Sequence, residues 1–358
     1  MASTKQLLIS VVLVVVLAII VRHAARVMFV LGLFNNKHNH APGPCHYVKG
    51  IDTGSEDLHV LPNGFTFVST GLTWPYMPYN ASVRTGIYGF DFNQPADGVV
   101  WLPMEGDFNQ DRVMSYHGIS VWKDKANDEV TLFVIAHREK KDTVELFKFN
   151  MDDKKLQHMK TIESPSFNSL NDLVATGPTS FYATNDGCFR SPSNRERLFV
   201  VEIFLLWACG SIVYYDGNSA GVVDDGHFFA NGMQLSSDGK TLYATLYGER
   251  ALVVFKRKHD NSIEEIRRIN VHLNADNINI HEETGDIWLG GAYRISVDPT
   301  ISYGSIVRIQ PHKEYTIDEY YSDDGKDLLM VSGAVRYEKQ LLIGTIAHKL
   351  LLCKLQTL

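Results

Sequence analysis

A single unit recurs along this chain, and its recurrence limits the folds that the chain can adopt. The unit is one or two polar residues followed by a strand, a turn and a second strand, which is the pattern of a β-hairpin. The first copy opens on Glu56 and Asp57, continues through an alternating strand, turns at residues 62–64 and returns through residues 65–68. One such hairpin cannot bury its apolar residues alone, so the copies must pack against one another.

Five later segments repeat this unit at a spacing of roughly fifty residues. They open on His117-Gly118, Asn171-Asp172, Asn231-Gly232, Asp276-Asn277 and Ser332-Gly333. Six hairpins at this spacing predict an all-β fold, a six-bladed β-propeller, in which the innermost strand of every blade lines a central tunnel. Polar residues at equivalent positions of different blades should therefore meet in the tunnel, although they lie far apart in sequence.

The residues that open the hairpins offer oxygen atoms for metal binding. A first set comprises Glu56, Asn171, Asn231, Asp276 and Asn277. Hard oxygen ligands in this number favour Ca²⁺ over Zn²⁺, and two carboxylates bring a divalent site close to neutrality. A second set, which comprises Asp57, Asp172 and the backbone carbonyl of Ile119, predicts a second Ca²⁺ deeper in the tunnel. A lone Asn or Asp at the start of a strand is more typical of an Asx turn, but five at equivalent repeat positions favour the cation.

Two histidines stand at opposite ends of the second hairpin. His117 opens this hairpin and His137 ends it, so the fold can bring both rings to the mouth of the tunnel. A single histidine would more often be structural, but a pair in which one ring fixes the tautomer of the other can take a proton from water. With a cation that polarises an ester or lactone carbonyl, the pair predicts hydrolysis. We expect no serine nucleophile to compete with it.

The N-terminal segment is strongly apolar. Residues 7–21 are apolar apart from Ser10, the polar stretch 22–26 interrupts the apolar sequence, and residues 27–34 resume it. Because no clean small-x-small cleavage site follows, we predict an uncleaved signal anchor over residues 1–34, a linker over 35–44 and the propeller over 45–358. The anchor predicts a membrane of the secretory pathway, the endoplasmic reticulum or the plasma membrane, with the propeller on the lumenal or extracellular side. The flanking charges specify this orientation only weakly.

Cysteine usage fits an exported protein. Cys45 and Cys353 stand at the two ends of the propeller segment, where a disulfide would close the ring, and two buried thiols are the alternative. Cys188 and Cys209 can pair with each other or stay free. Asn80 opens the only Asn-x-Ser/Thr sequon, which predicts N-glycosylation if the domain is lumenal.

Residues 190–210 form an insert between the third and fourth hairpins, with a basic, polar start and a strongly apolar continuation. The pattern predicts an extra helix, and two interpretations stay open: docking on a membrane surface beside the anchor, or packing over the mouth of the tunnel. The formal net charge is -7 and no basic stripe is present, so the sequence gives no reason to expect a nucleic-acid partner.

Sequence strings distributed from Cys45 to Cys353 resemble the serum paraoxonase/arylesterase family. They include KGIDTGSEDLHVLPNG, HGIS, TVELFKF, NDLVATGP, FYATND, FANG, DNINIHEETGDIWLGG and LLIGTIAHKLLLC, in the order of the family. The resemblance implies a six-bladed propeller with two Ca²⁺ ions in its tunnel and calcium-dependent hydrolysis of lactones and aryl esters. It assigns the first oxygen set to a catalytic Ca²⁺, the second to a structural Ca²⁺, and the two histidines to a catalytic dyad. It further implies that Asp186 and Phe229 line the substrate pocket.

Departures from the family lie in the expected pocket. Thr73-Trp74 stand where the family usually has Lys-Tyr at the active-site lid, so we expect Trp74 to line the pocket, and Gly291-Ala292 replace a Cys-His pair. These changes leave two functions open. We favour a membrane-anchored hydrolase of a small lipophilic lactone or ester, and the alternative is a non-catalytic chaperone for membrane proteins such as ion channels. The resemblance also aligns residues 190–210 with a membrane-docking helix, which favours that role for the insert.

Overall fold

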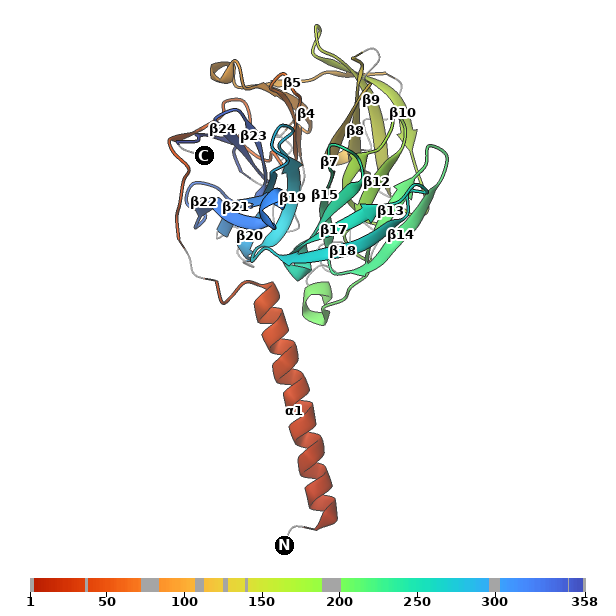
Figure 1. Ribbon diagram of the computed structural model, residues 1–358, viewed down its shortest axis with the longest axis vertical. Coiled ribbons are helices and arrows are strands. Elements are labelled where there is room, and N and C mark those ends of the chain that lie inside the picture. The colour runs from red at the N-terminus through yellow and green to blue at the C-terminus, as the bar shows by residue number, and fades with distance from the viewer. Residues whose placement is uncertain are drawn as a thin grey trace.

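The computed structural model describes residues 3–35, 38–71, 84–106, 113–124, 128–138, 141–188, 201–295, 303–346 and 348–356. Six β-sheets are arranged in a ring, and one long helix, α1 (Thr4–Val30), projects from it (Figure 1). The predicted six-bladed β-propeller is therefore confirmed. Trp74 and Asn80 lie outside the described residues, so the expectations for these two positions stay predictions.

Apart from one edge strand in blade 2 and one in blade 6, the strands of each blade follow one another in sequence, and the innermost strand of each blade contacts the innermost strands of its neighbours. Blade 1 contains β2 (Leu58–Val60), β3 (Phe65–Thr70), β4 (Gly86–Asp91), the short helix η1 (Pro95–Asp97) and β5 (Val99–Trp101). Blade 2 contains β7 (Val113–Lys123), β8 (Val130–Arg138), β9 (Asp142–Asn150) and β10 (Lys155–Ile162), with β6 (Met104–Glu105) parallel to β10 at its edge. Blade 3 contains β11 (Leu170–Ala175), β12 (Phe181–Asn185), β13 (Gly210–Tyr215) and β14 (Ala220–His227).

The next two blades have the same order, and each carries a short helix in one connection. Blade 4 contains β15 (Ala230–Leu235), β16 (Thr241–Leu246), η3 (Tyr247–Glu249), β17 (Ala251–Arg257) and β18 (Ile263–Asn270). Blade 5 contains β19 (Asn274–Ile280), β20 (Ile287–Arg294), β21 (Tyr303–Gln310), η4 (Pro311–Lys313) and β22 (Thr316–Asp323).

The sixth blade joins the two ends of the ring. It contains β23 (Val331–Tyr337), β24 (Gln340–Thr345) and β25 (Leu351–Lys354), and the N-terminal strand β1 (Cys45–Tyr47) completes it by pairing with β25. Cys45 lies opposite Cys353 in this pairing, and the two form a disulfide across 308 residues of sequence. The predicted ring-closing disulfide is confirmed. A crosslink over so long a loop removes many conformations from the unfolded chain.

The apolar core is divided among the interfaces between blades. Among the described residues, one cluster of buried side chains fills each of the six interfaces between neighbouring blades. Between blades 1 and 2, for example, Phe67 packs with Leu132 and Phe147, all of them fully buried. Because each sheet is covered on both faces, strands such as β3 are buried at every residue.

Helix α1 begins with a capping box between Ser3 and Gln6 and continues without a break through the polar stretch 22–26. A helix of this length spans about 40 Å, which exceeds the hydrocarbon thickness of about 30 Å in a typical bilayer. By length and composition alone, α1 is the one helix in the described part of the chain that could cross a membrane. Within α1 only Val27 and Val30 are buried, both in the last turn.

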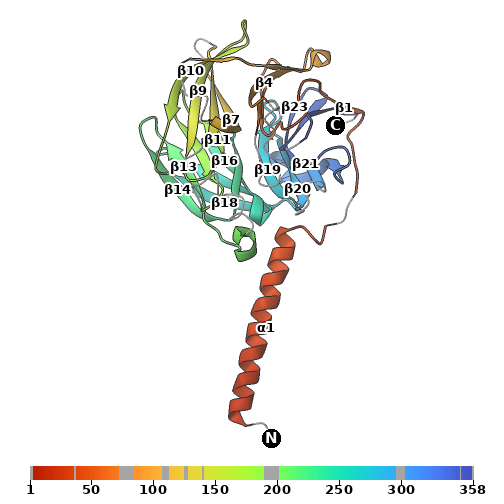
Figure 2. The same ribbon diagram turned by 180° about the vertical axis from the view of Figure 1, so that it is seen from behind.

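The last turn of α1 is fixed to blades 4 and 5. Arg250 donates a hydrogen bond to the carbonyl of Phe29 at 3.0 Å, and the side-chain amide of Asn274 donates one to the carbonyl of Val30 at 2.9 Å. Asn274 thereby satisfies a carbonyl at the end of the helix, and Arg250 adds a donor to the Phe29 carbonyl, which also accepts from the amide of Gly32 at 2.9 Å. Figure 2 shows the end of α1 reaching the ring near β18 and β20. The helix is therefore attached through specific contacts with the propeller.

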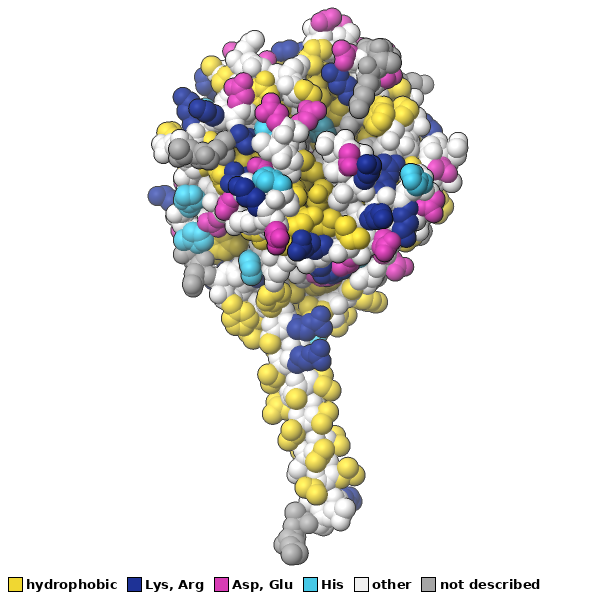
Figure 3. Space-filling model, in the orientation of Figure 1, with side chains coloured by type: hydrophobic (Ala, Val, Ile, Leu, Met, Phe, Trp, Pro, Cys, Tyr) yellow, Lys and Arg dark blue, Asp and Glu magenta, His cyan; other side chains and the backbone are white. Residues whose placement is uncertain are grey.

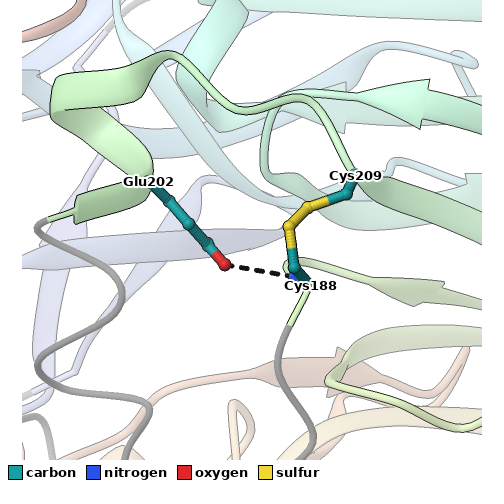
Figure 4. A group of neighbouring side chains, drawn as sticks. All are labelled: Cys188, Glu202 and Cys209. Atoms are coloured by element: carbon teal, nitrogen blue, oxygen red, sulfur yellow. Dashed lines mark hydrogen bonds between the residues drawn. A yellow bond between two sulfur atoms is a disulfide. The ribbon is translucent and has the colours of Figure 1, made fainter.

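The described part of the insert lies beside the end of α1. Cys188 and Cys209 form a disulfide at its base, and buried Glu202 accepts a hydrogen bond from the amide of Cys188 at 3.2 Å (Figure 4). Residues 201–205 are helical, and Ile203 packs in one apolar cluster with Val30. This pairing answers the question that the sequence left open for the two cysteines.

The same segment also exposes apolar side chains next to α1. Phe204, Leu205 and Trp207 are 55%, 58% and 49% exposed. His23 of α1 contacts the carbonyl of Phe204 at 2.7 Å, which places this surface directly against the helix. Hydrophobic side chains cover α1 and gather where it meets the ring (Figure 3). The described part of the insert thus packs one side on the propeller and leaves the other side apolar and exposed.

Candidate functional site

In four of the six blades, the polar pair that opens the hairpin lies at an irregularity inside the innermost strand. The register with the second strand shifts between Tyr116 and Ile119, between Leu170 and Leu173, between Ala230 and Met233, and between Ala275 and Ile278. Each shift leaves two consecutive residues out of the regular ladder, and these residues are the polar pairs that the sequence singled out. A β-bulge changes the direction of its side chains, so the bulges decide where these groups point. The sequence pattern predicted every pair ahead of its strand, which is confirmed for Glu56-Asp57 and wrong for these four pairs.

Glycines allow the innermost strands to approach one another closely. A Cβ atom on Gly118 would lie 2.6 Å from the Cα atom of Asp172, and one on Gly232 would lie 2.4 Å from the carbonyl oxygen of Asp276. Only glycine fits at such distances. The glycine in the His-Gly and Asn-Gly pairs therefore brings the polar residue of one blade next to that of the following blade.

The first oxygen set converges in the tunnel from blades 1, 3, 4 and 5. The side-chain amide of Asn277 donates to the backbone oxygen of Glu56 at 2.9 Å and to its carboxylate at 2.8 Å, across 221 residues of sequence. The side chain of Asn231 lies beside that of Asp276. Asn171 and Asp186, both of blade 3, meet at 3.4 Å. All five predicted residues of this set are buried.

Four oxygen atoms of this set are buried without a hydrogen-bond donor among the described residues. They are Glu56 Oε2, Asn171 Oδ1, Asn231 Oδ1 and Asn277 Oδ1. Leaving one buried acceptor without a partner costs about 1–3 kcal/mol, so four from different blades are unfavourable unless something else binds them. Neutral amide and carboxylate oxygens in such a group match the ligands of Ca²⁺.

Three carboxyl groups of the tunnel have raised pKa values. Burial is the main cause for Asp57, Asp172 and Asp276 alike. The charge of Glu56 raises the pKa of Asp57 and of Asp276 further, and the charge of Asp57 does the same for Asp172. Acidic groups of blades 1, 3 and 5 therefore repel one another in one buried region, which a divalent cation would relieve.

The second oxygen set is already engaged with the backbone. Asp57 accepts hydrogen bonds from the amides of Leu58 and Ile119, each at 2.7 Å. Asp172 accepts from the amides of Leu173 at 2.7 Å and Met233 at 2.6 Å. Each carboxylate thereby links the innermost strands of two neighbouring blades. A carboxylate has about four acceptor positions, so these contacts leave room for a cation.

Both predicted histidines lie in a chain of polar contacts that leads away from Glu56 and continues as hydrogen bonds from His117 onward. His117 Nε2 lies 3.5 Å from the carboxylate of Glu56, and His117 Nδ1 lies 2.9 Å from His137 Nε2. His137 Nδ1 in turn lies 2.7 Å from Asp142 Oδ1. All four side chains are buried. The two histidines therefore meet in the structure, and they stand beside the first oxygen set.

Sequence reasoning missed Asp142. This residue opens β9 and lies directly opposite His137 in the pairing of β8 with β9. The signal available in the sequence was the spacing of a histidine and an aspartate across a short hairpin turn, where the two residues face each other. A turn rich in Lys and Glu makes such an aspartate look like an ordinary turn residue.

The two described residues of the predicted substrate pocket lie in different surroundings. Asp186 accepts hydrogen bonds from Ser169 and Asn171, which places it beside the first oxygen set. Phe229 is buried in the cluster that contains Val30 and Ile203, and its φ of 55° is in the left-handed region. Phe229 therefore lies where α1 and the insert meet the ring.

Two alternative chemical sites can be set aside. Cys188, Cys209 and Glu202 bring metal-ligating atoms within 4.8 Å of one another, but the two sulfur atoms are joined in a disulfide (Figure 4). A Gly-x-Ser-x-Gly string is present at residues 217–221, and it forms the turn between β13 and β14. The amide of Ser219 in that turn donates to Asp216, and the residue is exposed. It is not the strand-to-helix elbow that activates a serine nucleophile.

Comparisons with known proteins agree with the fold and the strings noted in the sequence. The family model described as Arylesterase matches residues 38–355. The chain is 37% identical over 321 residues to serum paraoxonase/arylesterase 2 of Gallus gallus, covering 87% of this chain and 88% of that protein. It is 35% identical over 323 residues to serum paraoxonase/lactonase 3 of Rattus norvegicus, with 88% and 89% covered. A solved luciferin-regenerating enzyme shares the fold alone, with a TM-score of 0.51, 12% identity and 88% and 96% covered.

Proposed function

This chain belongs to the arylesterase family and is similar to serum paraoxonases over most of its length. We propose that it is a membrane-anchored, calcium-dependent hydrolase of lactones and aryl esters. Family membership supports the hydrolysis of esters or lactones. The proposal that this hydrolysis depends on Ca²⁺ and on a histidine base is carried by one observation, the meeting of unpartnered buried oxygens with the pair of histidines. Its proposed domains are an anchor over residues 1–34, a linker over 35–44 and a hydrolase domain over 45–358.

The proposed metal ligands are the two oxygen sets of the tunnel. Glu56, Asn171, Asn231, Asp276 and Asn277 would hold a catalytic Ca²⁺, and Asp57, Asp172 and the Ile119 carbonyl would hold a structural one. The orphaned oxygen atoms and the raised carboxyl pKa values both fit this assignment. A bound Ca²⁺ would polarise the substrate carbonyl and stabilise the oxyanion that develops from it.

The proposed base is His117. Its Nε2 atom faces Glu56 in the tunnel, while its Nδ1 atom is held by His137. A water molecule near Nε2 can lose a proton to it and attack the ester carbonyl. Asp186, Phe229 and Trp74 are the proposed walls of the pocket for a small lipophilic substrate.

The proposed membrane association can be tested by extraction. Full-length protein expressed in animal cells should stay in the membrane fraction at alkaline pH, because α1 is apolar and exposed over most of its length. A variant that lacks residues 2–26 keeps Val27 and Val30, which pack on the ring, and should be released. Release of the full-length protein would contradict the anchor.

If the propeller is lumenal, the variant Asn80→Gln should lose one glycan by electrophoretic mobility.

A hydrolysis screen tests the proposed function most directly. Purified full-length protein should turn over aliphatic lactones and aryl esters in the presence of Ca²⁺. Chelation should abolish this turnover, and added Ca²⁺ should restore it, because the proposed ligands are residues of the protein and can bind Ca²⁺ again. If calcium binds and no substrate of either class is hydrolysed, the proposed activity is wrong. The hypothesis of a non-catalytic chaperone for membrane proteins should then be tested.

A further inference from the structure

The structure assigns to Asp142 a positioning role, as the residue that fixes the tautomers of His137 and, through it, of His117. The catalytic consequence of this role rests on the proposed hydrolase function. The tautomers themselves do not, and they can be measured whether or not the protein hydrolyses esters.

The contact between Asp142 and His137 is built by the hairpin of β8 and β9. The two residues face each other in the register of this hairpin, and their side chains are 3% and 5% exposed. The carboxylate oxygen lies 2.7 Å from His137 Nδ1. An ionised carboxylate can only accept hydrogen bonds, so the proton in this contact must lie on Nδ1.

This assignment propagates to the second ring. With a proton on Nδ1, the neutral His137 has a lone pair on Nε2 and must accept there. His117 Nδ1, at 2.9 Å, is then the donor, which leaves the lone pair of His117 on Nε2. That nitrogen is the one that faces Glu56 in the tunnel. One carboxylate therefore decides that His117 presents a basic nitrogen to the site.

Asp142 is held in place by the neighbouring blade. Its second oxygen accepts a hydrogen bond from the amide of Leu170 at 2.8 Å. Leu170 opens β11 and directly precedes Asn171 of the first oxygen set. Turning the carboxylate away from His137 would also break its hydrogen bond with a buried amide. Asp142 thus connects the histidines of blade 2 with the strand that carries a proposed ligand.

The hydrogen bonds between His117, His137 and Asp142 allow a proton taken from water to be passed on to His137. When water attacks the ester carbonyl, an O–H bond of the water breaks and its proton bonds to His117 Nε2. The proton on His117 Nδ1 passes to His137 Nε2, so His117 is neutral again and the positive charge resides on His137. There it is stabilised by the carboxylate of Asp142, which does not take up the proton. The alternative is that Asp142 only closes the hairpin.

Asp142→Asn separates these alternatives. Asparagine supplies one acceptor oxygen, whereas Leu170 N–H and His137 Nδ1–H need two. If the amide nitrogen turns to His137, Nδ1 becomes the acceptor, His137 donates from Nε2, and His117 then carries its proton on Nε2. We expect kcat to fall on the order of 100-fold or more with KM within about threefold. Asp142→Glu restores the carboxylate and should recover part of the lost kcat.

Asp152→Asn is the matched control, because Asp152 is exposed in the turn between β9 and β10. It should leave kcat and KM unchanged. A kcat for Asp142→Asn within about threefold of the wild type would overturn the positioning role.

The tautomers give a readout that does not depend on activity. Long-range ¹H–¹⁵N spectra of the full-length protein labelled at histidine should show the proton of His137 and of His117 on Nδ1, with assignment by His137→Gln. A wild-type proton on Nε2 of His137 overturns the proposal, even if Asp142→Asn fails to fold. If no ester or lactone is hydrolysed, the proposed function fails, and these spectra still decide the role of Asp142.

Discussion

Calcium should stabilise this protein more at pH 8 than at pH 5, and the chelated protein should lose stability as the pH rises over that range. The pKa values of Asp57, Asp172 and Asp276 are raised by burial and by neighbouring acids. A carboxyl group whose pKa is higher in the folded state favours folding when protonated. That preference is lost as the pH rises from the ordinary carboxyl value near 4 through the raised folded values.

A bound divalent cation reverses this penalty, because it stabilises the ionised carboxylates. Protons compete with it, so the calcium-bound protein should lose its advantage as the pH falls. At a Ca²⁺ concentration about 100 times the dissociation constant, binding adds about 2.7 kcal/mol of stability. For a domain of this size, that corresponds to a rise in Tm of about 4 °C. Calorimetry at pH 5 and pH 8, with and without chelator, measures the effect.

The variant Asp276→Asn sharpens the test, since its two expected effects have opposite signs. Without calcium it removes a buried acid that Glu56 repels, so Tm should stay the same or rise. With calcium it removes a proposed ligand, so most of the calcium-dependent rise in Tm should disappear. Glu129→Gln, an exposed acid in blade 2, is the matched control and should behave as the wild type. Equal losses for Asp276→Asn in both conditions would rule out the ligand role.

The ring itself could be derived from the sequence because its signals are local and repeated. Residues 62–64 predict the turn that joins β2 and β3, and the structure places the two strands on either side of it. The closure of the ring also follows, because a propeller must bring its first and last strands together. Cys45 and Cys353 lie at those two positions.

The position of each polar pair within its strand could not be derived in the same way. Regular alternation predicts neighbouring residues on opposite faces, but the bulges in β7, β11, β15 and β19 interrupt this alternation. They occur where a neighbouring strand approaches within contact distance of Gly118 or Gly232. That approach is a property of the assembled ring, and no single hairpin contains the information.

Contacts between distant elements set a similar limit. The pairing of Cys188 with Cys209 depends on the pairing of β12 with β13, which brings Asn185 opposite Ser211 and so returns the chain to its starting point after the insert. The attachment of α1 depends on Arg250 and Asn274, whose roles appear only when the helix meets blades 4 and 5. In both cases the sequence contains the residues that make the contact, but their proximity follows only from the assembled fold.

His117→Gln should remove most of the hydrolytic activity and almost none of the stability. Glutamine has no basic nitrogen, so water near the tunnel would lose its proton acceptor, and kcat should fall about 10²- to 10⁴-fold. Lactone hydrolysis at saturating substrate measures this loss, and Tm should change by no more than a few degrees. His259→Gln, at an exposed turn between β17 and β18, should keep full activity.

The response to calcium separates this variant from a loss of the metal site. His117 is not a proposed ligand, although it lies 3.5 Å from Glu56, so His117→Gln should keep the calcium-dependent rise in Tm. Asp276→Asn should lose that rise and the activity together. Loss of the proposed base then lowers kcat alone, whereas loss of a proposed ligand also lowers the calcium-dependent rise in Tm. If His117→Gln hydrolyses lactones at the wild-type rate, proton abstraction by the histidine pair is wrong, even where calcium binding holds.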